Sequence, residues 1–324
     1  MTPAESAVVT RAAELRAALH ASLGHAVVGQ TQVIDGLLLA QMVGGHVLLE
    51  GVPGTAKTLM ARALAAAVDA RFRRVQFTPD LLPSDIVGTS VYRGDTGSFE
   101  FREGPIFTDL LLADEINRAP AKTQAALLEA MEERQVTADG VRHPLGDRFM
   151  VVATQNPVEF EGTYPLPEAQ LDRFLLKLEV PVLDVAAESE LLRRVDGGFN
   201  SLDLVGAGIT RVVDAPILAA VRAEVAAVAV SDGIIGYVAQ LCQATRTSPD
   251  LILGASPRGA IALLLGAKAL AACNGRDYVV PEDVKDLCVP TLRHRLIRRA
   301  EAEIQGVTEV GAVERAVARV PVPR

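Results

Sequence analysis

The stretch from His46 to Thr58 constrains the fold more than any other part of the chain. Its letters are HVLLEGVPGTAKT: an apolar run, a loop with two glycines, and then Lys57-Thr58 ahead of the helix-forming residues 59–65. Glycines let successive backbone N–H groups turn toward a polyphosphate, and the N-terminus of the next helix adds its positive dipole end. The order strand, loop, helix therefore predicts a phosphate-binding loop in an α/β domain rather than an ordinary glycine-rich turn.

Each side chain of this loop has an expected role. Lys57 can reach the outer phosphates of a nucleotide, and the Thr58 hydroxyl can ligate Mg²⁺. The residues expected to contact the nucleotide are Gly51, Pro53, Gly54, Thr55, Ala56, Lys57, Thr58 and Leu59. Ala56 departs from the usual G-x-x-x-x-G-K-[ST] pattern, since it stands in place of the second glycine. We expect a negative φ at Ala56, where alanine is tolerated, and a left-handed φ would count against a phosphate loop.

Composition narrows the class of protein. With 324 residues the chain is long enough for two domains, and 49% hydrophobic residues with no Trp predict an aliphatic core. The apolar runs are interrupted by charge, so no membrane span is expected, and the first residues lack the features of a signal peptide. Three scattered cysteines fit reduced thiols and a cytoplasmic location. The net charge of −8 argues against a broad nucleic-acid face, and we expect no nucleic-acid partner.

A second motif follows an apolar strand expected at 106–113, which ends in Asp114-Glu115. In a chain with a phosphate loop, Asp114 would hold Mg²⁺ directly or through water. Glu115 would orient and deprotonate the attacking water. The alternative is a strand that simply ends in surface acids, and the phosphate loop upstream argues against it.

A third polar group follows the strand expected at 149–154, where Asn156 could contact the γ-phosphate or its water. Strands that alternate with helices predict a parallel sheet, whose ligands collect at the carboxyl ends of the strands. The phosphate loop, Asp114-Glu115 and Asn156 all follow such ends. The sequence therefore predicts that the three come together in one site.

The remaining elements of the first half include two hairpins. Residues 90–102 alternate in character around Gly94–Gly97, and residues 135–143 surround an Asp139-Gly140 turn. The first could be a solvated surface hairpin without a function. Helices are also expected at 4–23, 33–42 and 120–133, strands at 72–77 and 175–180, and turns at 79–88.

From Pro181 to Asp184 the composition marks a boundary. It divides an α/β nucleotide domain, 1–183, from an all-helical lid domain, 184–324, with helices expected near 185–194, 215–229, 232–246, 257–273 and 281–289. Ser256-Pro257 is a good helix start. Arg258 then faces the wrong end of the helix dipole unless an anion lies nearby, and nucleotide phosphate is the natural candidate. For Arg173, a local ion pair with Asp172 is the alternative to a functional role.

Five motifs in order resemble those of MoxR-type AAA+ ATPases. They are GVPGTAKT at 51–58, ADEINRAP at 113–120, ATQNP at 153–157, LPEAQLDRF at 166–174 and ASPRG at 255–259. Ala56 is accommodated by this resemblance, because Ala-Lys-Thr is similar to a variant of the family loop. The resemblance implies a P-loop NTPase core, with a parallel sheet flanked by helices, followed by a helical lid.

The resemblance also implies roles that spacing cannot supply. Val28-Gly29-Gln30 resembles the adenine-side box, Asn156 the first sensor, and Arg258 the second sensor that reports nucleotide to the lid. Arg173 resembles the arginine finger, which completes the site of a neighbouring subunit. This implies a ring, with a hexamer expected. The two hairpins are similar to inserts that tend to face the pore or the substrate.

The implied activity is Mg²⁺-dependent hydrolysis of ATP that drives chaperone-like maturation or activation of a partner, often one with a von Willebrand factor A domain. One alternative is a related AAA+ motor, such as a chelatase motor subunit or a helicase, and the net acidity disfavours the helicase. The other alternative is a scaffold that binds ATP with little turnover. The presence of Glu115 and Arg173 argues against the scaffold.

Overall fold

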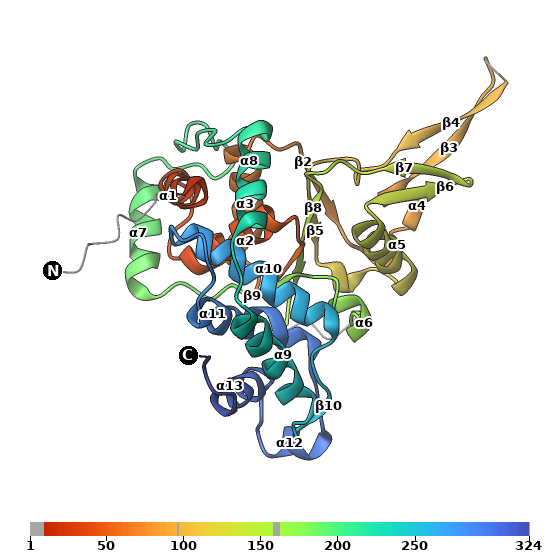
Figure 1. Cartoon of the computed structure of the whole chain (residues 1–324). Helices are drawn as coiled ribbons and strands as arrows, with labels where there is room; N and C mark the ends of the chain where they lie inside the picture. Colours follow the sequence, from red (N-terminus) through yellow and green to blue (C-terminus); the bar gives the residue numbers. More distant parts are fainter. Residues whose placement is uncertain (1–9, 96, 158–162, 324) are drawn as a thin grey trace.

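A computed structural model describes residues 10–95, 97–157 and 163–323. Its centre is a five-stranded sheet in the order β2-β5-β8-β1-β9, with helices on both faces (Figure 1). All four strand pairs are parallel, which confirms the predicted parallel sheet. The strands are β1 (Val47–Glu50), β2 (Phe72–Gln76), β5 (Leu110–Asp114), β8 (Met150–Gln155) and β9 (Leu176–Glu179). The carboxyl ends of β1, β5 and β8 therefore share one edge of the sheet.

The helices of the first half cover the two faces of this sheet. They are α1 (Arg11–Leu23), α2 (Thr31–Val43), α3 (Lys57–Ala67), α4 (Pro83–Val87), η1 (Ile116–Arg118), α5 (Ala121–Glu133) and α6 (Glu168–Leu171). Alternate residues of a strand face opposite sides, so Val47 and Leu49 pack in the cluster with α1 to α3 while Leu48 packs in the cluster with α5. Of the helix expected at 4–23, residues 4–9 lie outside the described residues. The turn-rich segment 79–88 contains α4, which was not predicted.

The second half is mainly helical. It contains α7 (Val185–Asp196), α8 (Ala215–Ala227), α9 (Asp232–Arg246), α10 (Pro257–Cys273) and α11 (Pro281–Leu292). Next come η2 (Arg293–Arg295), α12 (Ala300–Ile304) and α13 (Glu309–Arg319), and a small antiparallel pair joins β10 (Leu251–Leu253) to β11 (Ile297–Arg298). The elements after α11 were not predicted. The α10 helix begins as expected, because the Ser256 side chain caps it by accepting a hydrogen bond from the Gly259 N–H.

The lid helices pack against the first half of the chain. One cluster of buried side chains contains Leu19 of α1, Leu37 of α2 and Leu263 of α10. Arg222 of α8 adds a polar link by donating to the Gln41 carbonyl at 2.9 Å. The described residues therefore share a continuous core across residue 183, and the division into domains 1–183 and 184–324 stays a prediction.

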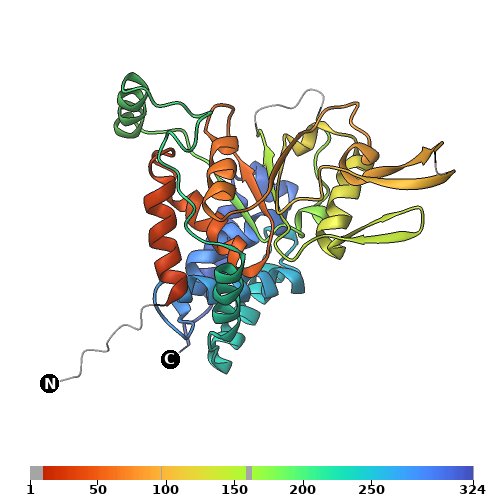
Figure 2. The ribbon, with the colours of Figure 1, turned by 90° about the horizontal axis from the view of Figure 1, so that it is seen from above.

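Both hairpins are present, as β3 (Gly88–Arg93) with β4 (Ser98–Glu103) and β6 (Gln135–Ala138) with β7 (Val141–Pro144). Residue Thr96 of the first turn lies outside the described residues. The hairpins project side by side, away from the sheet (Figure 2). Phe101 of β4 stacks on His143 of β7, with ring centroids 3.9 Å apart. Tyr92 and Phe99 lie further out and are 58% and 73% exposed, so this hairpin presents aromatic side chains to solvent.

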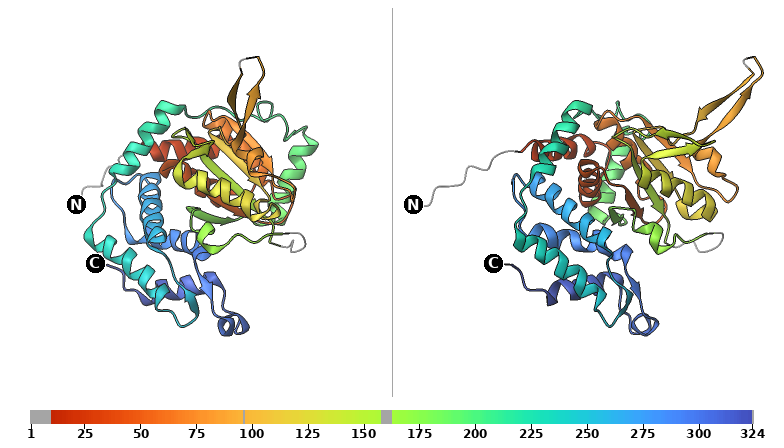
Figure 3. Two further views of the ribbon diagram at one scale, coloured as in Figure 1. Left: turned by 90° about the vertical axis from the view of Figure 1, so that its right-hand side faces the viewer. Right: turned by 45° about the vertical axis from the view of Figure 1, so that its right-hand side comes forward.

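The hairpins and the lid helices α9 to α13 lie at opposite ends of the molecule (Figure 3). In the described part of the chain, no helix combines the length and the apolar character that crossing a membrane requires. The three cysteines are buried and unpaired with one another.

Candidate active site

A cavity of about 480 Å³ opens at the carboxyl edge of the sheet. Its lining comprises Pro53, Gly54, Thr55, Ala56, Lys57, Thr58, Leu59, Arg62, Asp114, Glu115, Thr154, Asn156, Ser201 and Leu202. The structure thus brings together the loop after β1, the acids at the end of β5 and the amide after β8. Their meeting in one cavity is the arrangement that the order of strands and helices predicts.

The Lys57 ammonium lies inside the phosphate loop. Its Nζ donates to the carbonyl oxygens of Gly51 at 2.6 Å and Val52 at 2.8 Å. Burial lowers the pKa of Lys57 below its usual value, and the nearby carboxylates of Asp114 and Glu115 oppose that shift. The loop therefore holds a cation at its centre, next to two acids, where a polyphosphate would need it.

The backbone of Ala56 contradicts the prediction. Its φ is +63°, in the left-handed region, so the expected negative φ is wrong and this test went against the phosphate loop. The physical reason is that Ala56 is the residue immediately before α3, where the loop turns left-handed so that the helix can begin at Lys57. The left-handed conformation costs an alanine residue about 1–2 kcal/mol of free energy. The phosphate loop is supported instead by its place in the cavity and by the contacts of Lys57.

Asp114 is held by three side chains. Its Oδ2 accepts from Arg74 Nε at 2.9 Å and lies 3.4 Å from the Thr58 hydroxyl, and its Oδ1 accepts from Thr154 Oγ1 at 2.6 Å. No group of three His, Cys, Asp or Glu side chains in the described ranges could hold a metal ion. A hydroxyl beside a single carboxylate is instead the hard oxygen set that suits Mg²⁺, which takes its other ligands from water and phosphate.

Glu115 is held from two directions. Its Oε2 accepts from Gln76 Nε2 at 2.6 Å and pairs with Arg118 Nε at 3.1 Å. The backbone N–H of Glu115 donates to Thr154 Oγ1 at 2.9 Å, so Thr154 bonds to both adjacent acids. These contacts fix the carboxylate at the side of the cavity.

Sequence reasoning missed Arg74, Gln76, Arg118 and Thr154 as partners of the two acids. A signal was present for two of them, because Arg74 and Gln76 are two apart in a predicted strand and so lie on one face of it. In the sheet Gln76 pairs with Asp114. Which strand would lie beside β5 is a matter of strand order, and the spacing of polar residues carries no information about it.

The segment Val28-Gly29-Gln30 lies near the same edge without lining the phosphate cavity. Gln30 is buried, and its Nε2 donates to the Pro181 carbonyl at 2.9 Å, just after β9. Gly29 has φ +72°, and a Cβ there would come 3.0 Å from Leu183. The segment is therefore held against the connection from the sheet to α7.

The connection after α7 reaches the cavity, which was not predicted. Arg62 of α3 donates from Nη2 to the Leu202 carbonyl at 3.2 Å, and both residues line the cavity with Ser201. The segment 195–212 has the glycines of a loose connection, and its backbone lies across the first helix after the loop. It adds a wall that the motifs do not indicate.

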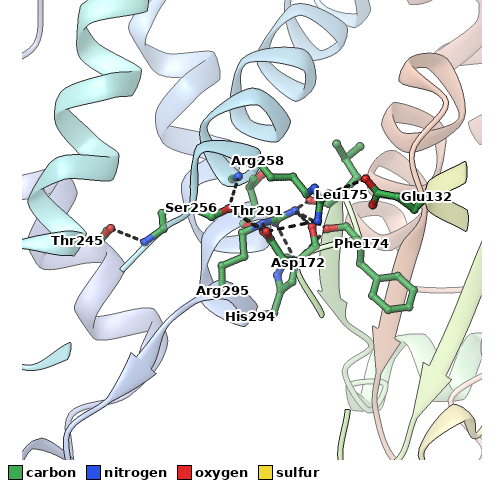
Figure 4. Close-up of polar contacts among 12 residues, drawn as sticks. Glu132, Asp172, Phe174, Leu175, Thr245, Ser256, Arg258, Thr291, His294 and Arg295 are labelled. Carbon is green, nitrogen blue, oxygen red and sulfur yellow. Dashed lines mark hydrogen bonds and ion pairs between the residues drawn. The ribbon is translucent and has the colours of Figure 1, made fainter. Parts of the chain in front are cut away.

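Arg173 and Arg258 belong to a second polar cluster, because both pair with Glu132 near the end of α5, Arg258 at 2.6 Å and Arg173 at 3.4 Å. Figure 4 shows Arg258 and Glu132 in this cluster, together with Asp172 and Arg295. Asp172 pairs with the buried Arg295 of η2 at 2.7 Å rather than with Arg173, which contradicts the alternative of a local ion pair. Neither Arg173 nor Arg258 lines the nucleotide cavity.

The topology places this cluster at the opposite edge of the sheet. Strands β1 and β9 are parallel, and Val47 pairs with Leu176 as Glu50 pairs with Glu179. The phosphate loop follows Glu50, whereas Arg173 precedes β9 and its neighbour Leu175 donates to the carbonyl just before β1. The length of β9 alone, about 10 Å, separates the two levels. The two arginines therefore lie at the edge of the sheet opposite to the chain's own phosphate loop.

Comparisons with known proteins match this architecture. The family described as "ATPase family associated with various cellular activities (AAA)" matches residues 46–176, and an AAA lid domain matches residues 243–316. Chaperone MoxR1 of Mycobacterium tuberculosis is 40% identical over 312 residues, which cover 92% of this chain and 80% of that protein. The chain belongs to the MoxR family of AAA+ ATPases.

Two further similar proteins match nearly the whole length of this MoxR-family chain. The uncharacterized protein YeaC of Bacillus subtilis is 45% identical over 321 residues, covering 94% of this chain and 96% of YeaC. A crystal structure from Cytophaga hutchinsonii superimposes with a TM-score of 0.87 at 43% identity and covers 97% of both chains. The AAA match contains the phosphate loop, Asp114-Glu115 and Arg173, and the lid match contains Arg258 and Arg295.

Proposed function

We propose that this chain is an ATP-hydrolysing subunit of a ring, in which Arg173 and Arg258 of one subunit complete the nucleotide site of the next. The ring is expected to be a hexamer. The observation that carries this proposal is the separation of Lys57, Asp114 and Glu115 from the two arginines, at opposite edges of one sheet. A head-to-tail contact between identical chains joins two different surfaces and closes into a ring when the rotation permits.

The residues of the carboxyl edge have separate tasks in hydrolysis. Lys57 and the N–H groups of the loop bind the phosphates, and Asn156 orients the γ-phosphate or the water beside it. Glu115 takes the proton of the attacking water. Arg173 of the neighbour stabilises the charge that develops on the transferred phosphoryl group, and Arg258 reports the nucleotide to the lid.

The adenine and the metal have assigned places in this proposal. Val28-Gly29-Gln30 would bind the adenine side of ATP. Thr58 and Asp114 would hold Mg²⁺, whose chemistry when bound is to neutralise charge on the phosphates.

Mixing two inactive variants tests the shared site. Glu115→Gln chains bind ATP without a base, and Arg173→Ala chains have a complete loop but lend no finger. In mixed rings the Arg173→Ala site receives Arg173 from a Glu115→Gln neighbour, so ATP hydrolysis returns. The matched control is the double variant Glu115→Gln/Arg173→Ala, which should restore nothing. Full activity of Arg173→Ala alone, or a mixture that stays inactive, would show that the arginine does not act between subunits.

We further propose that the ATP cycle drives chaperone-like remodelling or activation of a partner, one with a von Willebrand factor A domain. The family includes Chaperone MoxR1, and the projecting hairpin exposes Tyr92 and Phe99, a surface suited to contact with a protein. A pull-down with Glu115→Gln in ATP, read by mass spectrometry, tests the partner. Recovery of such a domain, lost on adding Lys57→Ala, supports this assignment, and recovery of a chelatase subunit or nucleic acid contradicts it.

A further inference from the structure

The second polar cluster contains the arginines Arg173, Arg258 and Arg295, and Arg295 is the most deeply buried of them. It lies at the end of η2, and its side chain is 2% exposed. Its Nε donates to Asp172 Oδ1 at 2.7 Å, so a lid residue is paired with a residue of the first half of the chain. A buried charge needs a partner and further hydrogen bonds, and Arg295 has both.

Arg295 also binds backbone carbonyl groups on both sides of Arg173. Nη2 donates to the carbonyl oxygens of Asp172 at 3.1 Å and Phe174 at 2.6 Å, and Nη1 donates to that of Leu175 at 3.3 Å. The backbone is therefore bound immediately before and immediately after Arg173. Figure 4 shows Arg295 beside Asp172 and Phe174. Arg295 does not touch the Arg173 side chain in these contacts, but it holds the segment from which that side chain extends.

Asp172 connects the same cluster to Arg258. Its carboxylate accepts from the Ser256 hydroxyl at 2.9 Å, and Ser256 is the cap of α10, two residues before Arg258. Gly259 allows close packing here, because a Cβ at that position would come 3.0 Å from Arg295 Cδ. The Asp172 carboxylate and the Arg295 guanidinium thus connect the backbone segments that carry Arg173 and Arg258.

We propose that Arg295 is a positioning residue, which sets from the lid where Arg173 and Arg258 stand relative to each other so that both reach one neighbouring nucleotide. This inference rests on the proposed shared site and assigns it a residue outside the five motifs. Two guanidinium groups that act on one phosphate must be placed together, and a shift of about 1 Å in such a group can lower a rate about 100-fold. Arg295 Nη1 also donates to the Thr291 carbonyl. Lysine at 295 keeps the charge but has no planar fork, so it cannot hold the carboxylate and four carbonyl oxygens at once.

Variant chains that serve only as arginine donors test this proposal. The acceptor is Arg173→Ala, whose own nucleotide site is complete, and the donor is Glu115→Gln with or without Arg295→Lys. We expect the Arg295→Lys donor to reduce the restored kcat roughly tenfold or more, with no change in the ATP concentration for half-maximal rate. The ATP requirement stays because the acceptor binds the nucleotide.

A matched lid arginine serves as control. Arg276 forms a comparable two-bond pair with the buried Asp283, at 2.6 and 2.7 Å, within the lid. A Glu115→Gln/Arg276→Lys donor should restore hydrolysis as well as Glu115→Gln does. Thermal unfolding, binding of a fluorescent ATP analogue and the mass of the mixed rings are measured for every donor, because a merely structural role would lower all three.

The outcomes separate this inference from the function on which it rests. Unchanged rescue by the Arg295→Lys donor, or loss of rescue because a folded Arg295→Lys donor fails to enter rings, overturns the positioning role and leaves the shared site intact. Failure of the plain Glu115→Gln donor overturns both. Loss of kcat from a folded, ATP-binding donor that is present in the rings supports the proposal.

Ser256 provides a second variant if Arg295→Lys does not fold. Ser256→Ala removes the hydroxyl that donates to Asp172, whereas Ser256→Thr keeps a hydroxyl and still caps the helix. In the donor chain, Ser256→Ala should lower the restored kcat severalfold and Ser256→Thr should recover it. Equal rescue by the two donors would overturn the proposed role of this cluster.

Discussion

The charged residues at the two edges of the central sheet differ in their partners within the chain and in their exposure to solvent. At the carboxyl edge, Lys57, Asp114 and Glu115 line one cavity. Their partners come from neighbouring strands and from the loop itself. At the amino edge, Arg173 and Arg258 both pair with Glu132, and Arg258 also lies 3.8 Å from the Asp172 carboxylate. Their side chains are 28% and 45% exposed. The carboxyl edge has a cavity lined by Lys57 and the two acids, and at the amino edge two cations are paired in a partly exposed cluster.

This difference indicates how assembly and chemistry are connected. An ion pair exposed to solvent contributes only about 0–1 kcal/mol, so in the proposed ring the exchange of Glu132 for the phosphate of a neighbouring subunit would require little energy. The frame behind the arginines is different, because Arg295 is almost fully buried and bonded on several sides. The amino edge therefore combines side chains that are free to exchange partners with a backbone that is not.

The largest expected effect is on the carboxyl edge alone. Glu115→Gln should keep nucleotide affinity and lower kcat roughly 10²- to 10⁴-fold, because the amide cannot accept a proton from water. Steady-state ATPase rates and binding of a fluorescent ATP analogue measure the two effects separately. The matched control is Glu129→Gln on the exposed side of α5, which should change neither. A normal rate in Glu115→Gln would remove the base from this edge and break the comparison.

We expect low pH to reduce the stability of the fold through the amino edge, where His46 and His294 are buried. Burial lowers the pKa of His46 to about 4, and burial beside Arg295 lowers the pKa of His294 well below its usual value. Below pH 6.5 the unfolded chain therefore binds protons that the folded chain does not, and stability falls as the pH falls toward 4. For His46 alone the loss between pH 7 and pH 5 is roughly 2 kcal/mol.

Denaturant unfolding at the two pH values measures this loss. His46→Asn keeps an acceptor for the Val151 N–H, which donates to His46 Nδ1 at 2.9 Å, and should show a smaller loss between pH 7 and pH 5. No residue that lines the nucleotide cavity is a histidine. An equal pH dependence in His46→Asn and the native chain would show that these histidines do not distinguish the edges.

The carboxyl edge could be predicted largely from sequence, and the amino edge could not. The phosphate loop, Asp114-Glu115 and Asn156 each follow a strand, and parallel strands bring such residues together whatever their order. The pairing of Arg173 with Glu132 joins residues on different elements, and no periodicity indicates it. The link from Arg295 to Asp172 spans 123 residues and depends on how the lid packs. The prediction of a negative φ at Ala56 was wrong for another reason, since a residue type limits φ without determining it.

Releasing the arginines should have a moderate effect of the opposite sign. Glu132→Gln removes the carboxylate that pairs with both Arg173 and Arg258 and leaves Arg258 its longer pair with Asp172 at 3.8 Å, so these cations should meet a neighbour's phosphate with less competition. We expect half-maximal ATPase activity at a roughly two- to fivefold lower protein concentration, the size expected for exposed ion pairs. The adjacent Glu133→Gln is the control. A higher concentration requirement in Glu132→Gln would instead make Glu132 a support for the arginines.

The smallest effect concerns the conformation of Ala56 at the carboxyl edge. Ala56→Gly removes the unfavourable left-handed alanine at φ +63° but gives the unfolded chain more freedom, so the net stabilisation should be less than about 1 kcal/mol. Gly54 is the matched reverse case, because its φ is +85° and Gly54→Ala should destabilise the chain. Denaturant unfolding measures both, and nucleotide affinity should change less than about twofold in Ala56→Gly because the loop keeps its shape. A large loss of stability in Ala56→Gly would mean that the alanine methyl group supports the loop more than its backbone strains it, and the carboxyl edge would then depend on packing at the one position where we attribute its conformation to the backbone.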